Sequence, residues 1–382
     1  TYTVSGSCAD GSIKVKKGTT GVTLVLDGLT LTSENTAAIT CGKSSEVTIL
    51  VSNGTENSLS DTEQNNDDNY PENENAENAV IKCEDGSLVT LCGDGELTIT
   101  ANGKNGIKSG ATTDEDGEAS LTIRDLTLNI DAPVNDAINA EQLLNVESGT
   151  LTIDAYSSAG DGFDSNGDLT ITGDTVIVWT ANTADNEPLD ADGTITVSGG
   201  TVLAAGGSSG MGMNLEAAQP CVIYGSTGFG GMPGSTQSSL IAADADFTIE
   251  DADGNAVYSG TARCGANFIL FSSADVVADS AYTLKAGNSS TEGTAQSETV
   301  STGMGMGMGM GGGFPGGGQK PDGEPPESFD GQMPNGEKPE LPDGEVPEMP
   351  SGERPTPPSG QGSPADGNAP AGDSTSDTTP TA

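Results

Sequence analysis

Acidic and amide side chains recur in this chain within short segments that share one pattern. In "DGFDSN", residues 161–166, two aspartates and an asparagine surround the apolar Phe163. The same pattern is present in "NGIKSG" (105–110), "DAINAE" (136–141), "EPLDAD" (187–192) and "MGMNLE" (211–216). The apolar anchors are Ile107, Ile138, Phe163, Leu189 and Met213. After a longer first interval these anchors are 25, 26 and 24 residues apart, so we interpret the segments as copies of one repeated unit.

Stacking of such units in register would bring equivalent side chains together in columns. Two residues before the anchor the column is Asn105, Asp136, Asp161, Glu187 and Met211. One residue after the anchor it is Lys108, Asn139, Asp164, Asp190 and Asn214. Three residues after the anchor it is Gly110, Glu141, Asn166, Asp192 and Glu216. The residues that we predict to bind metal from these columns are Asp136, Asn139, Glu141, Asp161, Asp164, Asn166, Glu187, Asp190, Asp192 and Asn214.

Columns of oxygen ligands favour a hard cation. Neighbouring carboxylates repel one another, by about 1 kcal/mol in water and several times more at a partly buried site. Either raised pKa values or bound cations relieve this repulsion, and variable spacing suits Ca²⁺ better than Mg²⁺. The alternative is that Asp and Asn stabilise turns through hydrogen bonds to the backbone without any metal. An EF-hand is excluded, because the loops starting at Asp164 and Asp251 have Thr175 and Ala262 where the twelfth-position Glu is needed.

The composition narrows the possible partners. The chain has 382 residues, a formal net charge of −44 and no histidine. Such acidity repels nucleic acid and anionic membranes, and it favours cations or anionic ligands reached through bridging cations. No apolar run approaches the roughly 20 residues of a membrane-spanning helix, so we expect neither nucleic-acid binding nor membrane insertion. We expect a monomer.

The elements that must position these side chains are short β-strands. Segments of alternating apolar residues and threonine recur, such as "LTIT" at 97–100 and 169–172, with Gly, Asn and Asp between them. The residues Leu126, Leu151, Val176 and Val202 follow at intervals of 25, 25 and 26 residues. We therefore predict an all-β fold, a parallel β-helix whose units stack at the strand spacing of about 4.8 Å. A β-sandwich is the competing architecture.

Three regions are predicted along the chain. Residues 1–218 form the repeats, with an acidic insertion at 61–78. Residues 219–301 contain segments such as "CVIYG" and "NFILFSS" that we interpret as a small cap of antiparallel strands. Residues 302–382 are rich in Gly and Met, then in Pro and Glu, which predicts a disordered linker or stalk.

The six cysteines form no C-x-x-C pair, which argues against a zinc or redox site. An even count in a chain rich in Thr, Ser, Gly and Asp suggests a secreted protein with disulfides. Cys41 and Cys83 align at the same position of the repeat, and Cys8 is an alternative partner for Cys41. We expect Cys221 to bridge to Cys264 within the C-terminal part.

Repeated D-G-apolar-[DN] turns followed by "LTIT", the acidic insertion, and the Gly/Met-rich and then Pro-rich tail together resemble a known group. These features are similar to secreted carbohydrate-binding domain-containing β-helix proteins of anaerobic, plant-fibre-degrading bacteria. The resemblance covers roughly residues 20–300. It implies a right-handed parallel β-helix related to calcium-dependent pectate lyases, several Ca²⁺ ions, and affinity for polygalacturonate and cellulose. The calcium turns of the family fall on "NDAIN" (135–139), "GDGFD" (160–164) and "PLDAD" (188–192), whereas 105–110 and 211–216 depart from the pattern.

The sequence is compatible with three functions. The first is non-catalytic, calcium-dependent binding of acidic plant cell-wall polysaccharide, outside the cell or at the cell surface. The second is a pectate-lyase-type eliminase, in which a lysine such as Lys108 would act as the base beside Ca²⁺. A lysine paired with a carboxylate on the surface is the ordinary alternative for that residue. The third is a structural adhesin that binds calcium without binding polysaccharide.

Overall fold

The computed structural model describes residues 1–301 apart from 158–159, 209–212, 226–237 and 298. The tail predicted at 302–382 lies outside the described residues. The described part of the chain consists of β-strands and turns, without a helix. The all-β prediction is therefore confirmed, and no described segment is a helix long and apolar enough to cross a membrane.

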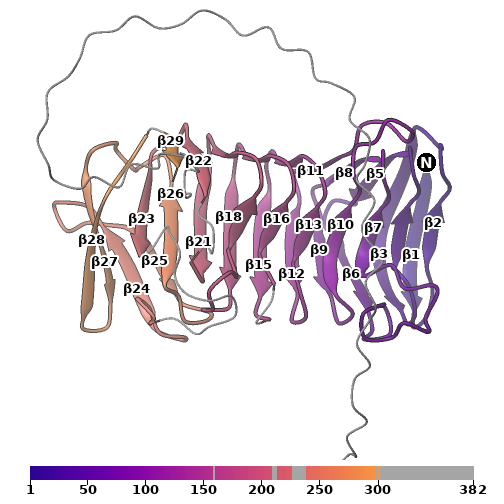
Figure 1. Ribbon diagram of the computed structural model, residues 1–382, viewed down its shortest axis with the longest axis horizontal. Helices are drawn as coiled ribbons and strands as arrows, with labels where there is room; N and C mark the ends of the chain where they lie inside the picture. Colours follow the sequence, from indigo (N-terminus) through magenta and orange to yellow (C-terminus); the bar gives the residue numbers. More distant parts are fainter. Residues whose placement is uncertain (158–159, 209–212, 226–237, 298, 302–382) are drawn as a thin grey trace, which may run out of the picture. The chain divides into compact units, whose positions relative to one another are not determined.

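Seven short strands form a purely parallel sheet, which contains all but the last of the repeated segments (Figure 1). In spatial order they are β2 (Ile13–Val15), β4 (Ile39–Cys41), β7 (Ala79–Cys83), β10 (Asn105–Ser109), β13 (Ile138–Ala140), β16 (Phe163–Ser165) and β19 (Leu189–Ala191). Spatial order follows chain order, so each strand pairs with its equivalents in the preceding and following repeats.

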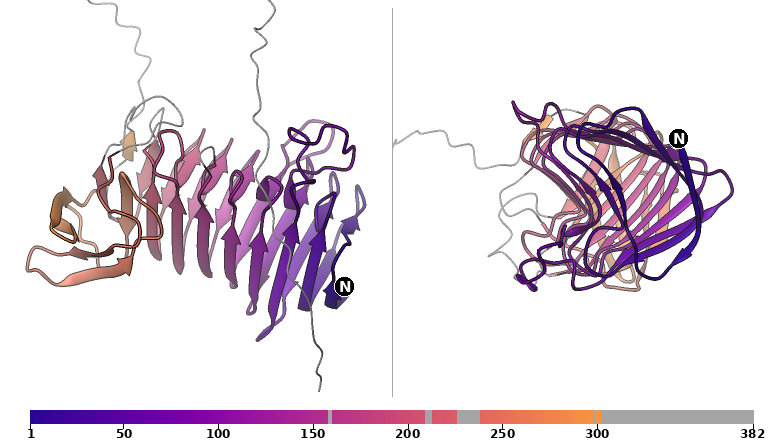
Figure 2. Two further views of the ribbon diagram at one scale, coloured as in Figure 1. Left: turned by 90° about the horizontal axis from the view of Figure 1, so that it is seen from below. Right: turned by 90° about the vertical axis from the view of Figure 1, so that its right-hand side faces the viewer.

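A larger sheet of 18 strands contains two further series of parallel strands. The first series continues from β3 (Val22–Ser33) through β5 (Glu46–Val51), β8 (Leu88–Gly93), β11 (Ser120–Arg124), β14 (Leu144–Val146), β17 (Leu169–Ile171), β20 (Ile195–Val197) and β22 (Asn214–Ala217). The second runs from β1 (Tyr2–Cys8) through β3, β6 (Glu56–Asp61), β9 (Glu96–Thr100), β12 (Thr127–Asp131), β15 (Thr150–Ala155), β18 (Thr175–Thr180) and β21 (Thr201–Gly206). One repeat thus contributes three strands, for example β13, β14 and β15. Figure 2 shows these strands following one another in series.

Alternation of apolar and polar residues decides which side chains enter the core. The anchors Ile107, Ile138, Phe163 and Leu189 are fully buried and stack on one another through the seven-stranded sheet. Burial of each such side chain stabilises the fold by about 1.5–3 kcal/mol. Because side chains point alternately to the two faces of a strand, the polar residue after each anchor points away from this core.

The predicted repeat differs from the structure at one point. Leu151, Val176 and Val202 pair in register as expected, but the partner of Leu151 is Leu128 and not Leu126. Both leucines are buried, so an alternating pattern alone does not distinguish them. Asp125, which precedes Leu126, has a positive φ of 64° and forms the turn between β11 and β12. Residue 126 therefore belongs to the turn and not to the strand.

The C-terminal part contains the predicted antiparallel strands. β26 (Phe268–Ser272) pairs antiparallel with both β21 and β23 (Cys221–Gly225). A separate four-stranded antiparallel sheet comprises β24 (Asp246–Glu250), β25 (Ala256–Thr261), β27 (Ala281–Ala286) and β28 (Ser289–Thr294). The last strand, β29 (Thr299–Ser301), pairs with β22.

The predicted disulfides are not present, because all six cysteines are free in the structure. Cys41 and Cys83 do occupy equivalent positions, as expected, and both are buried in the core. Neighbouring thiols that point inward from paired parallel strands pack there as small apolar groups. Cys221 is also buried, whereas the Cys264 thiol donates to the Thr180 carbonyl oxygen at 2.7 Å.

Candidate metal centre

The predicted register of the repeated segments is confirmed in the seven-stranded sheet. Ile107 pairs with Ile138, Ile138 with Phe163, and Phe163 with Leu189. Asp136, Asp161 and Glu187 each lie two residues before an anchor, where the chain enters β13, β16 and β19. Backbone bonds continue the stack at these positions, since the Gly162 amide donates to the Glu187 carbonyl oxygen at 3.0 Å.

A second row of polar side chains lies inside the strands. Asn139, Asp164 and Asp190 pair directly across β13, β16 and β19. Each of them is half-buried, in contrast to the buried anchors beside them. The two rows together place five carboxylates from three consecutive repeats close to one another.

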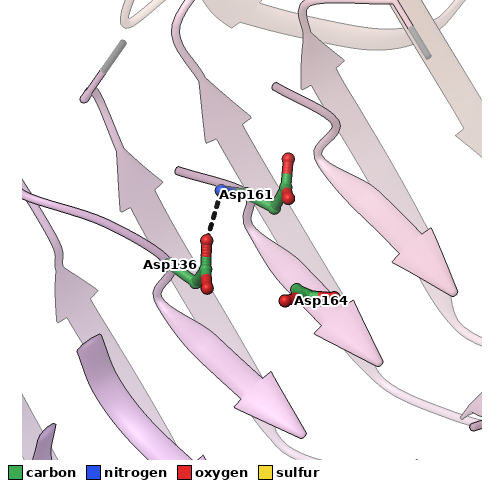
Figure 3. Close-up of side chains that lie close together, drawn as sticks. All are labelled: Asp136, Asp161 and Asp164. Atoms are coloured by element: carbon green, nitrogen blue, oxygen red, sulfur yellow. Dashed lines mark hydrogen bonds between the residues drawn. The ribbon is translucent and has the colours of Figure 1, made fainter. Parts of the chain in front are cut away.

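Two groups of three carboxylates meet the spacing that a shared cation requires. In the first group, Asp136, Asp161 and Asp164 have ligand oxygens that all lie within 4.8 Å of one another (Figure 3). Asp161, Glu187 and Asp190 form the second group, with the same spacing. Because Ca²⁺ binds oxygens at about 2.3–2.6 Å, two ligands on one ion are separated by no more than about 5 Å. Asp161 belongs to both groups.

Hydrogen bonds within and between repeats use some of these oxygens. Oδ1 of Asp136 accepts from the Asp161 amide at 3.0 Å, the bond drawn in Figure 3. Oδ1 of Asp161 accepts from the Glu187 amide at 2.6 Å. The side-chain amide of Asn139 donates to Oδ2 of Asp136 at 2.9 Å and to Oδ2 of Asp164 at 2.5 Å. These bonds hold the carboxylates in place and leave acceptor capacity on each of them.

Burial and mutual repulsion make these carboxylates difficult to ionise without a cation. Burial, followed by the charges of Glu187, Asp136, Asp190 and Asp164, raises the pKa of Asp161 well above its usual value. Burial, with the charges of Asp136 and Asp190, raises the pKa of Asp164 to about 7. The pKa of Asp190 is raised to about 6, and that of Asp136 is also raised, mainly by burial in both cases. A bound divalent cation would remove this penalty.

The third predicted column lies beside this cluster and makes other contacts. Glu141 forms an ion pair with Lys108 at 3.2 Å, and it accepts from the Asn166 side-chain amide at 2.6 Å. Asp192 is exposed, and its backbone amide donates to the Ser165 carbonyl oxygen. Glu141 and Asp192 therefore belong to neither of the two groups of three carboxylates, and the Asn166 side-chain amide is bonded to Glu141.

The predicted position of Asn214 is wrong. Its strand, β22, pairs with β20 in the 18-stranded sheet, where Leu215 faces Ile195. The Asn214 side-chain amide donates to Oγ1 of Thr194 at 3.1 Å. The segment 211–216 has the composition of a repeat, but its described residues from Asn214 onward belong to β22, and the last strand of the seven-stranded sheet is β19.

Two features of this region were missed at the sequence level. The first is the sharing of Asp161 between two groups, which depends on side-chain geometry. The second is Lys14, which belongs to the row of Lys108 and Asp164 through β2 and β4. The apolar-polar-apolar pattern of "IKV" (13–15), like that of "ITC" (39–41), is the signal that could have identified it.

Comparisons with known proteins place the chain in a family. The sequence profile of a family described as "Carbohydrate-binding domain-containing protein" matches residues 1–262. A protein of that same description from Acetivibrio thermocellus is 37% identical over 111 residues, which are 28% of this chain and 36% of the relative. The chain thus spans about a third of the length of that relative. No solved structure matches. Since the profile covers more than half of the sequence, this chain belongs to the carbohydrate-binding domain-containing family.

Proposed function

We propose that the protein is a non-catalytic module that binds acidic plant cell-wall polysaccharide, such as polygalacturonate, through Ca²⁺ held by the carboxylates of the candidate metal centre. It would act outside the cell or at the cell surface, with its stacked repeats wound as a right-handed parallel β-helix. The family supports carbohydrate as the partner. Calcium and the acidic glycan are our extension of that assignment.

One observation carries this proposal. Five carboxylates from three repeats form two overlapping groups of three. Within each group, one oxygen of every carboxylate lies within 4.8 Å of those of the other two. Only oxygen ligands are present, which suits a hard cation of high coordination number. Carboxylates of uronic acids could complete the coordination of such an ion. In this way an acidic protein with a net charge of −44 can bind an acidic polymer that would otherwise be repelled.

Retention on immobilised polygalacturonate, with millimolar CaCl₂ or with EDTA, tests the proposal. We expect calcium-dependent retention of the wild type and its loss in Asp161→Asn, because this substitution removes the carboxylate that both groups share. Asp253→Asn, at an exposed turn between β24 and β25, is the matched control and should be retained like the wild type. Wild-type protein that elutes equally early with and without calcium would refute the proposal, and a cellulose column run in parallel shows whether a neutral glycan is also bound.

The contacts of Lys108 favour a binding module over an eliminase. Its ammonium pairs with Glu141 at 3.2 Å, the arrangement of an ordinary surface ion pair. A catalytic base must be free to accept a proton from the substrate. We therefore expect no unsaturated uronate, measured by its ultraviolet absorbance, when the protein is incubated with polygalacturonate and Ca²⁺. Accumulation of that product would instead support the eliminase.

A further inference from the structure

The outward-facing row that contains Asp164 changes sign along the seven-stranded sheet. We call it the central row, and its residues pair in sequence from β2 to β19. Its members are Lys14, Thr40, Lys82, Lys108, Asn139, Asp164 and Asp190. Lysines thus occupy the part of the row nearer the N-terminus, and aspartates of the candidate metal centre occupy the other.

Lys82 differs from most cations in the described part of the chain. Lysine and arginine side chains there generally form ion pairs with carboxylates, as Lys14 does with Glu77 and Lys43 with Asp85. No carboxylate oxygen of a described residue lies within ion-pair distance of the Lys82 ammonium. Lys82 is half-buried between the buried Ile81 and Cys83, and it pairs in register with Lys108.

Two neighbouring lysines without full compensation are unfavourable in themselves. Burial, and then the charge of Lys108, lowers the pKa of Lys82. The charges of Glu77 and Asp85 offset this shift only in part, and these carboxylates are themselves paired with Lys14 and Lys43. An anion bound from solution would favour the charged form of the lysine and offset its desolvation.

We propose that Lys82 and Lys108 form a cationic subsite for a carboxylate of the same acidic glycan that the candidate metal centre binds. This inference rests on the proposed function and extends it by assigning a direction to the glycan, along the central row. Lys82 and Asp164 are three strand spacings apart, about 14 Å at about 4.8 Å per step. A single oligosaccharide of several uronate units can therefore contact both ends, one through the lysines and the other through Ca²⁺.

The lysine subsite should bind a glycan carboxylate without any metal, so its contribution can be measured independently of the candidate metal centre. In EDTA, at an ionic strength of about 0.1 M that screens the repulsion between the acidic protein and the glycan beyond about 10 Å, we expect weak binding of oligogalacturonate to the wild type, measured by calorimetry. Lys82→Gln should lower this affinity about fivefold to tenfold, the effect of losing one charge-assisted contact. Lys82→Arg should restore most of it. Lys285→Gln, which removes an ammonium paired with Glu250 in the four-stranded sheet, is the matched control and should have no effect.

The second comparison is between Lys82→Gln and the wild type in the presence of calcium. Lys82→Gln should bind Ca²⁺ like the wild type and still be retained on polygalacturonate with calcium, but less tightly. The affinity of the wild type should rise steeply once the oligomer is long enough to span both ends of the central row. Equal affinity of Lys82→Gln and wild type in both buffers would overturn the subsite. Unsaturated product formed by the wild type and abolished by Lys82→Gln would overturn it too, because Lys82 would then be a base. If calcium does not increase the retention of the wild type on polygalacturonate, the proposed function itself is refuted.

Discussion

At the scale of single residues, the four aspartates of the candidate metal centre have raised pKa values, so they hold protons at a pH where ordinary aspartates release them. The pKa of Asp164 is raised to about 7 and that of Asp190 to about 6, in both cases first by burial. In the unfolded chain both groups would titrate near pH 4. The folded state therefore binds more protons than the unfolded state between about pH 4 and pH 7.

This difference predicts how the stability of the calcium-free protein depends on pH. Because the folded state binds more protons in that window, its free energy of unfolding falls as the pH rises from 4 to 7. We expect a higher thermal midpoint in EDTA at pH 5 than at pH 7.5, measured by circular dichroism. Calcium should reverse the order, since it stabilises the ionised carboxylates.

Burial also raises the pKa of Asp61 to about 6, so Asp61 contributes to the same fall in stability with rising pH. A double variant in the cluster is therefore needed to isolate the contribution of the candidate metal centre. In Asp161→Asn/Asp164→Asn two of the five carboxylates are neutralised, which reduces the repulsion, and the new amide at position 164 can continue the row of Asn139. The variant should be more stable than the wild type in EDTA at pH 7.5, by about 1–2 kcal/mol once solvent contact of Asp164 is allowed for. A variant that is less stable under those conditions would show that the carboxylates are not strained in the absence of metal.

At the scale of strands and turns, close backbone contacts fix the spacing between repeats. Gly162 separates Asp161 from the anchor Phe163. A Cβ atom there would lie 2.5 Å from the Pro188 carbonyl oxygen of the next repeat and 2.2 Å from Cγ1 of Val178. Glycine is needed at this position, directly before β16, because the backbone of the next repeat approaches it closely.

Gly162→Ala should therefore separate β16 from β19 locally. We expect a loss of about 1–3 kcal/mol of stability in urea unfolding, typical of overpacking. Calcium affinity should fall as well, because Asp161 and Glu187 lie on either side of the contact. Gly260→Ala in β25 is the control, since a Cβ atom there would have only side-chain atoms of Tyr258 and Phe247 as its three nearest neighbours, at 3.1 Å or more, and no backbone atom of another strand. Unchanged calcium affinity in Gly162→Ala would mean that the backbone contact does not set the geometry of the carboxylates.

Period-two alternation and the recurrence of the anchors were sufficient to predict the strands and the register that joins Asp136, Asp161 and Asp164. Other features depend on three-dimensional information. Asn214 fits the sequence pattern, yet the sheet ends before it, and only strand pairing reveals this. The cysteine count suggests disulfides, whereas Cys41 and Cys83 pack as free thiols because a paired position in the core suits small apolar groups equally well.

At the scale of the whole molecule, the described strands, from β1 to β29, belong to one compact unit of the chain. Each repeat packs on its neighbours, so a ligand that joins three repeats should stabilise the unit beyond its own site. A net charge of −44 opposes compaction, and calcium bound at the candidate metal centre would reduce that charge.

We therefore expect calcium to raise the thermal midpoint of the whole unit. At a free concentration a hundredfold above the dissociation constant, one site contributes about 2.7 kcal/mol. Circular dichroism at pH 7.5 should show a midpoint several degrees higher in calcium than in EDTA, and magnesium at the same concentration should have a smaller effect. A midpoint that does not respond to calcium would argue that the carboxylates serve only as turn residues.

The position of Asp161 in both groups of carboxylates has a consequence for how ions would enter. Binding of a first ion would keep the Asp161 carboxylate ionised and fix its orientation. This would favour binding of a second ion, because one of its ligands is then already ionised and oriented. The positive charge of the first ion would at the same time repel the second. Occupancy would then proceed in two unequal steps. The protein could respond to two different ranges of calcium concentration, with one ion keeping the repeats together and the other, more readily exchanged, opening or closing contact with the polymer.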